Sequence, residues 1–457
     1  MRYDPILAAI RFGTGLGPRF SPPASAADLL QELIGPDRMA AAFPLPPYDQ
    51  SIAQHGQFVA ATRGRRKETD PTRRKAFMAE QKRLRRVAQG VYRAGLRHNL
   101  ARAVEADYGF RERLARFWAD HFTVGKRTPI LTEAISCYAD EAIRPNLAGD
   151  FATLLKSAVT HVAMLLYLQQ AYSAGPNSPV IKKRPDRGLN ENLAREVLEL
   201  HTLGVEAGYS QTDVRQLAEL FTGLSYQAGE GFRFRGPFVE PGAETVLGRS
   251  YEGGLADIHA ALDDLARHPA TARHLARKLA VHFVDDRPDP ALVDHVAAAY
   301  SASDGDLTAT YSALLDHPAA WTPERRKVRQ PFDFIAAALR ALDMPGAQVA
   351  ALPTRKTNGR LLGPMALMGQ PWERPDGPDG LPEEAAAWVT PQGMAARIQW
   401  AMHAPQVLMD GLPDPRTFVV SALGGTASAD LAFAAGAAAT RAEGIGLVLA
   451  SPEFQRR

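Results

Sequence analysis

The densest group of chemically useful side chains lies in residues 190–204, where three glutamates, one arginine and one histidine occupy about four expected helical turns. At about 100° per residue, Glu191, Arg195 and Glu199 fall on one line and can form a ladder of ion pairs. Glu196 falls instead at the border of the apolar face. A carboxyl group held against apolar surface has a raised pKa and can act as a general acid. A hydrogen bond from Glu196 to a neighbouring helix explains the same position without any chemistry.

The histidine of this segment does not complete a metal site. His201 flanks the other border of the apolar face, about 140° from Glu196, so the two side chains point apart. The spacing of Glu199 and His201 also differs from the Glu-x-x-His spacing of di-iron helices. The chain contains no His-x-x-x-His or His-Glu-x-x-His motif. We therefore expect neither a metal centre nor a cofactor.

A second acid and histidine stand next to each other in the sequence. Asp120 follows Arg116 by one helical turn, so an ion pair within the helix explains its position. His121 shares an apolar face with Leu114 and Phe117, which predicts a core histidine bonded to a backbone carbonyl. A general base that titrates near neutral pH is the alternative. The candidate catalytic residues are Glu196, Asp120, His121 and Glu199.

Further polar side chains could bind a ligand. Lys327 and Arg329, close to Asp333, could hold an anionic group, and a charged, capped helix start explains them equally well. The candidate binding residues are Asn190, Asn192, Arg195, His201, Lys327 and Arg329.

A stripe of cationic and imidazole groups follows the spacing of one helix face. His274, Lys278 and His282 are separated by four residues each. The two histidines would lie about 12 Å apart along the helix axis, which is too far for them to share a metal ion. We interpret the stripe as solvated or facing an anion.

The elements that must position these side chains are mainly helices. Asn190 is expected to cap the helix over 190–204, and Gly204 to end it. Ser210 and Asp213 resemble a capping box that opens the next helix. Asp306 is expected as another N-cap. Further helices are predicted over 255–284, 290–301, 306–317 and 328–342, and a hairpin or lid within 230–250.

These elements predict a mostly α fold: a large multi-helix globular body with Pro/Gly-rich loops and one short β-hairpin or lid. Three regions are expected. Residues 1–100 wrap the body, residues 101–345 form a helical core that carries the β element, and residues 346–457 are loop-rich and helical and pack on that core.

A strongly basic stretch lies at 63–86, where eleven lysines and arginines face three acidic residues, a local formal charge of +8. A solvated helix with a flexible start explains it simply. Alternatively, the stretch could bind a polyanion, an anionic membrane surface or an acidic partner. Few aromatic residues alternate with the cations, so specific binding of nucleic acid by base stacking is not expected.

Composition sets the outer bounds. The chain has 457 residues, of which 46% are hydrophobic, so it can bury a large core. Its one cysteine, Cys137, cannot form an internal disulfide, which fits a reducing compartment but also an exported protein without disulfides. No transmembrane segment and no signal peptide are predicted, which favours the cytoplasm.

Several stretches are similar to the bacterial domain of unknown function 1800 family. They include Phe117-Trp-Ala-Asp-His-Phe-Thr-Val124, the long motif that begins Asn190-Glu-Asn-Leu-Ala-Arg-Glu and ends Gly204-Val205, Gly208-Tyr-Ser-Gln-Thr-Asp-Val214 and Ser451-Pro-Glu-Phe-Gln455. Ala9-Ile-Arg-Phe-Gly13, Arg267-His-Pro-Ala-Thr-Ala272 and Lys327-Val-Arg-Gln-Pro-Phe332 fit as well. The resemblance covers nearly the whole chain.

The resemblance implies a mostly helical protein. It also implies a periplasmic or envelope-associated location, and a partner of sulfatase-like or phosphatase-like fold that is exported and encoded nearby. The chain departs from the family pattern at three places. Asp120 stands where the family usually has Asn, Leu224 replaces a usual Trp, and the lid carries Val239, Glu240 and Glu244 in place of a His-Asp pair and a Lys. A family activity carried by the lid is therefore in doubt here.

Two functions stay open on these grounds. The first is a binding or assembly component that acts with a neighbouring exported protein or with a cell-envelope polyanion. The second is a carboxylate-based hydrolase that acts on a glycan or another polar substrate.

Overall fold

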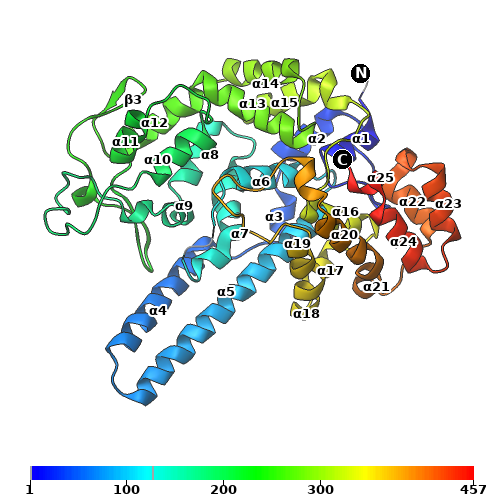
Figure 1. Cartoon of the computed structure of the whole chain (residues 1–457), viewed down its shortest axis with the longest axis horizontal. Coiled ribbons are helices and arrows are strands. Elements are labelled where there is room, and N and C mark those ends of the chain that lie inside the picture. Colours follow the sequence, from blue (N-terminus) through cyan, green and yellow to red (C-terminus); the bar gives the residue numbers. More distant parts are fainter. Residues whose placement is uncertain (1–2, 126–127) are drawn as a thin grey trace.

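The chain folds into a mostly α-helical body with two short β-hairpins (Figure 1). The computed structural model describes residues 3–125 and 128–457. The predicted fold class is confirmed, except that the sequence indicated one β element where the structure has two. Within the described ranges, no helix combines the length and the apolar character that a membrane span requires.

Three short helices begin the chain and lie against the body. They are α1 (Pro5–Arg11), α2 (Ala26–Ile34) and α3 (Arg38–Ala42). The buried guanidinium of Arg11 donates hydrogen bonds to the carbonyl of Ala320 at 2.7 Å and to that of Glu324 at 2.8 Å. These bonds hold the start of the chain on a segment more than 300 residues later.

The next two helices form a long antiparallel hairpin that projects from the body (Figure 1). They are α4 (Tyr48–Lys67) and α5 (Pro71–Glu105). Asp70 caps α5 by accepting a hydrogen bond from the backbone N–H of Arg73 at 2.8 Å. The helices approach closely at Gly64, where an added Cβ would lie 2.5 Å from the ring of Phe77. The basic stretch 63–86 therefore occupies the far end of this hairpin.

The larger hydrophobic core lies under the helices that follow. These are α6 (Phe110–His121), α7 (Ile135–Tyr138), α8 (Phe151–Val159), α9 (Val162–Tyr167), α10 (Asn192–Glu196), α11 (Gln211–Leu220), α12 (Leu255–Arg267), α13 (Pro269–Phe283), α14 (Pro290–Ala302) and α15 (Leu307–Asp316). The capping box of Ser210 with Asp213 and the N-cap at Asp306 are confirmed.

Two hairpins lie between α11 and α12. Strands β1 (Leu224–Gln227) and β2 (Gly231–Phe234) pair antiparallel, as do β3 (Glu244–Val246) and β4 (Arg249–Tyr251). Glu240 and Glu244 are both less than 10% exposed. Glu240 accepts a hydrogen bond from the backbone N–H of Asn177 at 2.8 Å, so this altered lid residue anchors the loop after α9.

A second hydrophobic core joins the inner half of α5 to the C-terminal helices. These are α16 (Pro331–Ala341), α17 (Gly346–Ala350), α18 (Thr354–Lys356), α19 (Gly363–Leu367), α20 (Pro391–His403), α21 (Pro405–Leu408), α22 (Pro415–Leu423), α23 (Ala429–Ala437), α24 (Arg441–Ala450) and α25 (Pro452–Gln455). Helix α16 thus shares its core with the C-terminal region, although the expected region boundary follows it at 345.

Single turns of other helix types complete the backbone. The 3-10 turns are η1 (Leu131–Ala134), η3 (Arg144–Asn146), η4 (Gln170–Tyr172), η6 (Gly236–Phe238), η7 (Pro318–Trp321), η9 (Ala385–Trp388) and η10 (Gly424–Thr426), and the π turns are η2 (Ala139–Ile143), η5 (Val197–His201) and η8 (Thr357–Leu362). The π turn η5 directly continues α10, so it changes the face that each residue of the 190–204 motif presents.

Candidate functional site

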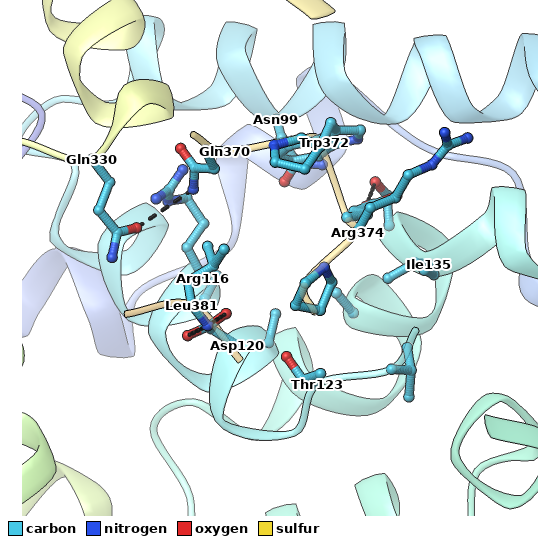
Figure 2. Close-up of a pocket in the computed structure, with 18 of the residues that line it drawn as sticks. Asn99, Arg116, Asp120, Thr123, Ile135, Gln330, Gln370, Trp372, Arg374 and Leu381 are labelled. Carbon is cyan, nitrogen blue, oxygen red and sulfur yellow. Dashed lines mark hydrogen bonds between the residues drawn. The ribbon is translucent and has the colours of Figure 1, made fainter. Parts of the chain in front are cut away.

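A cavity of about 110 Å³ lies where the two cores meet. One wall is the outer face of α6, with Ala115 and Ala119, and the opposite wall is the 370–375 loop with Trp372 (Figure 2). Inner α5 contributes Asn99, and the segment before α16 contributes Gln330. The wall is largely apolar with a few converging polar groups, which is the usual character of a small-molecule site.

Asp120 lies in the cavity wall at the end of α6. Its carboxylate oxygens accept hydrogen bonds from the backbone N–H of Leu381 at 3.1 and 3.2 Å (Figure 2). Gly380 makes this approach possible, because its φ is 83° and an added Cβ would lie 2.8 Å from the Asp120 carbonyl oxygen. Burial, assisted by the nearby charge of Glu383, raises the pKa of Asp120 to about 7.

The ion pair expected between Asp120 and Arg116 does not form. Arg116 points its guanidinium to Asp333 at 3.2 Å and lies 3.8 Å from the centre of the Phe332 ring. The helical spacing brings Asp120 and Arg116 to one face, but α16 offers Arg116 a buried carboxylate and an aromatic face. Asp120 is consequently left with backbone donors and without a cation bonded to it.

Glu373 is a second acid in the cavity wall, and the sequence did not single it out. It accepts a short hydrogen bond from the hydroxyl of Ser136 on α7, and burial raises its pKa to about 8. Its φ of 49° is unusual for a residue with a side chain. The only signal in the sequence is a lone acid between Trp372 and Arg374 in a proline-rich loop, and this pattern alone does not distinguish a site from a surface turn.

Asp333 gathers three cations, two from α6 and one from the C-terminus. Arg113 of α6 lies 3.7 Å from it, and Arg457 at the C-terminus donates to it at 3.0 Å, in addition to Arg116. Burial opposes ionisation of Asp333, but the guanidiniums of Arg113 and Arg116 outweigh it and hold the pKa below its usual value. This cluster connects both cores directly behind the cavity.

The two candidate binding residues before α16 are engaged by the protein itself. The ammonium of Lys327 donates to Asp286 at 2.6 Å and to the carbonyl of Glu383. The guanidinium of Arg329 donates to the carbonyl of Phe454. Both side chains are less than 5% exposed. This environment fits a structural role at the charged start of α16 better than a site that holds an anionic ligand.

The stripe of α13 is not solvated, and of its two interpretations the one in which it faces an anion fits, because the carboxylate of Glu383 lies against it. His282 is 4% exposed, and its Nδ1 donates to Glu383 at 2.7 Å while its Nε2 accepts from Arg113 at 3.1 Å. His274 and Lys278 are half-buried, and burial lowers the pKa of each. Spacing by four residues identifies one face of α13, but it does not reveal that α6 and the loop carrying Glu383 cover that face.

His274 of this stripe also meets two further histidines, His121 and His201. The ring centres of His121 and His201 are 5.9 Å apart, and those of His121 and His274 are 6.4 Å apart. Nε2 of His121 bonds the carbonyl of His201 at 3.1 Å, as expected for a core histidine. Burial lowers the pKa of His201 to about 3 and that of His121 far below its usual value. All of these rings are therefore neutral at pH 7.

The 190–204 motif keeps its ion-pair ladder but not its regular helix. Arg195 lies 3.3 Å from both Glu191 and Glu199, and Asn190 accepts from the N–H of Asn192 at 2.9 Å. These contacts leave Asn190, Asn192 and Arg195 at a partly exposed surface.

The π turn η5 accommodates about one more residue per turn than an α-helix does. The side-chain directions predicted at 100° per residue are therefore wrong after Glu196. His201 turns inward, to 1% exposure, while Leu200 remains half-buried. Glu196 itself is half-buried, and burial together with the charge of Glu199 raises its pKa to about 7. Within the described chain, neither Glu196 nor His121 belongs to the cavity wall, so the structure does not unite the four candidate catalytic residues.

The far end of the α4–α5 hairpin forms a second feature, an exposed basic surface. Ten of the eleven cations in 63–86 are exposed and Arg65 is half-buried. Among the described residues, the ion pair of this stretch is the one between Arg83 and Glu80, at 2.7 Å. The predicted flexible start is helical instead, since α4 continues through Lys67.

Comparison with known families gives a match over nearly the whole chain. The family described as "Protein of unknown function (DUF1800)" matches residues 19–456, nearly the entire chain. No curated protein and no solved structure matches the chain.

Proposed function

Because the chain belongs to the DUF1800 family, whose function is unknown, we propose a function from its own geometry: it is a binding component that holds a polyanion through the tip of the α4–α5 hairpin. The observation that carries the proposal is the exposed basic surface, with ten exposed cations at the end of a projecting element. A location at the cell envelope and assembly with an exported sulfatase-like or phosphatase-like partner belong to the same proposal, by resemblance to the family.

The small number of acidic partners for the exposed cations of the hairpin tip supports this function. Exposed charges that have no partner gain free energy when they meet a polymer of opposite charge, because bound counterions are released. Arg73, Arg74 and Lys75 follow one another near the start of α5 and are all exposed. Like charges there also oppose the helix dipole and each other, so a ligand that neutralises them stabilises the tip.

The surface fits a polymer recognised by charge better than one recognised by its bases. Phe77, the aromatic residue within 63–86, is half-buried and packs against Gly64. It therefore offers no free ring for base stacking, which single-stranded nucleic acids require for tight binding. Met78 and Val87 are exposed between the cations, so the surface is not purely polar.

The test compares two triple variants. Arg73, Arg74 and Lys75 are changed to Gln in one protein, and Lys182, Lys183 and Arg184, three consecutive exposed cations of a loop, are changed to Gln in the other. Binding to sodium polyphosphate is measured by fluorescence anisotropy at low salt. We expect the hairpin variant to bind at least about tenfold more weakly and the loop variant to bind like the unchanged protein. Equal losses in both variants would refute a dedicated hairpin surface.

A carboxylate-based hydrolase is the second candidate, and one specific observation favours it. Asp120 reaches the cavity wall, and burial raises its pKa to about 7, so it can hold a proton for transfer at neutral pH. Purified protein and the Asp120→Asn and Glu196→Gln variants should be tested on a panel of glycans and esters. Turnover that Asp120→Asn abolishes would support the hydrolase. Absence of turnover in the unchanged protein would exclude it for that panel.

A further inference from the structure

We infer that the cavity between α6 and the 370–375 loop is a binding site for a neutral, hydroxyl-rich ring, such as a single sugar unit. This inference extends the second candidate function, because it names the class of ligand. It concerns binding alone, so it can fail while the hydrolase survives, and it can hold if no turnover is found.

The charges of the wall favour a neutral ligand. The three cations of the wall are already matched: Arg116 with Asp333 at 3.2 Å, Arg144 with Glu112 at 2.5 Å, and Arg374 with Glu133 at 3.9 Å. Asp140 is likewise paired with Arg102 at 2.6 Å. Arg374 is 43% exposed and its contact with Glu133 is long, but the two buried cations among the described wall residues each have a close carboxylate, so the buried part of the wall leaves no cation for an anion.

The two remaining acids of the wall are suited to hydroxyl groups. Asp120 is bonded by a backbone N–H and Glu373 by a hydroxyl, and neither carboxyl is bonded to a cation. Because burial raises the pKa of both, each carries a proton over much of the neutral range and offers one donor and one acceptor. A hydroxyl group can use this combination, whereas an ammonium group would be held best by an ionised carboxyl, which burial disfavours at both positions.

Trp372 supplies an apolar face and a donor. One face of its ring stacks on Phe332, with ring centres 5.4 Å apart and planes at 18°, and Figure 2 places the ring at the edge of the cavity next to Asn99. The side chain is 9% exposed, and its indole N–H has no acceptor among the described residues. Oxygen Oε2 of Glu373 is also buried without a donor there. Buried polar atoms without partners are rare and mark places where a ligand or water is expected.

Size and backbone strain agree with a small ring. A buried water needs roughly 10–15 Å³, so about 110 Å³ accommodates several heavy atoms with hydroxyl substituents. The φ of 49° at Glu373 is the kind of unfavourable backbone conformation that concentrates at ligand sites. The loop thus holds the carboxyl in the wall at a conformational cost.

Calorimetric titration of the full chain tests the inference with defined probes. Glucose, N-acetylglucosamine and myo-inositol represent neutral rings, and spermidine and inorganic phosphate represent charged ligands. The blocking variant is Ala119→Leu, which fills the cavity and keeps a helix-forming residue on α6. Its control is Ala298→Leu, on the exposed face of α14. A second variant, Trp372→Phe, keeps an aromatic ring that can stack on Phe332 and removes the indole N–H together with part of the ring surface.

We expect saturable binding of at least one neutral ring. Its affinity should fall by tenfold or more in Ala119→Leu and by about tenfold in Trp372→Phe. The affinity of Ala298→Leu should equal that of the unchanged protein. If Ala119→Leu fails to fold, the affinity of Trp372→Phe for the neutral rings tests the inference by itself. Binding of no neutral ring overturns the inference, as does equal binding by Ala119→Leu or Trp372→Phe, and so does preferential binding of spermidine or phosphate.

Discussion

Burial sets the proton occupancy of the two carboxyl groups in the cavity wall. Asp120 and Glu373 each have a single hydrogen-bonding group at hand, and neither has a bonded cation to favour its ionised form. Asp333 is more deeply buried but is surrounded by guanidiniums, and its pKa shifts in the opposite direction. The wall acids and Asp333 therefore differ in their tendency to hold a proton near neutral pH, which is a common way for proteins to separate catalytic from structural carboxylates.

The raised pKa of Glu373 predicts a pH-dependent stability. In the folded state the pKa is about 8, against 4.5 for an unperturbed glutamate. Between these values the folded state retains a proton that the unfolded state releases, so Glu373 makes the protein less stable as pH rises from 4.5 to 8. Gln cannot ionise, so Glu373→Gln should be more stable than the unchanged protein by about 1–3 kcal/mol at pH 8 and nearly equal to it at pH 5.

Urea unfolding at both pH values measures this difference. Glu384→Gln, in an exposed position of the same loop region, is the matched control and should change little. A Glu373→Gln effect of the same size at pH 5 and pH 8 would contradict the assigned pKa shift.

The sequence predicted the two acids unequally. Asp120 was found because helix α6 has a regular period and its residues 114, 117 and 121 mark the buried face. Glu373 lies in an irregular loop, where no period relates sequence position to direction, so only the three-dimensional path of the loop places it opposite Ser136. Long-range partners such as Leu381 for Asp120 are likewise invisible to spacing rules, and those rules favoured Arg116.

At the scale of elements, the hairpin α4–α5 determines where the basic stretch lies, and the π turn η5 determines which side chains of the 190–204 motif point into the core. The hairpin holds the basic stretch away from the body, and its close packing depends on Gly64 facing Phe77. The Ser210–Asp213 capping box, most of the helices and strands β2 and β3 followed from local signals, whereas β1 lies before the predicted 230–250 element and the helix predicted over 255–284 is divided into α12 and α13. The π turn could not be predicted, because an inserted residue in a helix leaves the hydrophobic pattern almost intact while it shifts every later side chain.

Two glycines in this hairpin predict opposite effects of the same substitution. Gly64→Ala places a Cβ 2.5 Å from the Phe77 ring, so the helices must separate at the tip, and we expect a loss of about 1–3 kcal/mol. Gly90→Ala on α5 meets no atom within 4 Å and should stabilise the protein by about 0.5–1 kcal/mol through helix propensity. Thermal unfolding distinguishes the two. Stabilisation by Gly64→Ala would show that the helices do not pack as described.

At the scale of the whole molecule, the carboxylate of Asp333 joins the two cores and the C-terminus. Its partners come from α6 and from the last residue of the chain, Arg457, whose backbone N–H also bonds the carbonyl of Lys327 at 2.9 Å. The cavity lies at this junction, so the two cores must remain docked for its walls to face each other.

Asp333→Asn should destabilise the protein by about 3–5 kcal/mol, because Arg113, Arg116 and Arg457 would be left buried without their shared counter-charge. Asp410→Asn, at an exposed position, should change the free energy of unfolding by less than about 0.5 kcal/mol. Denaturant unfolding at neutral pH measures both. A loss below about 1 kcal/mol for Asp333→Asn would mean that the cluster does not hold the cores together.

The most direct test of the proposed polyanion binding is the dependence of polyphosphate affinity on salt. The slope of log affinity against log salt concentration reports how many counterions the protein displaces, and each lost contact reduces it by roughly 0.7–0.9. For the triple variant of Arg73, Arg74 and Lys75, we predict a slope about two units shallower than that of the unchanged protein. An identical slope in the two proteins would show that the hairpin tip does not contact the polymer.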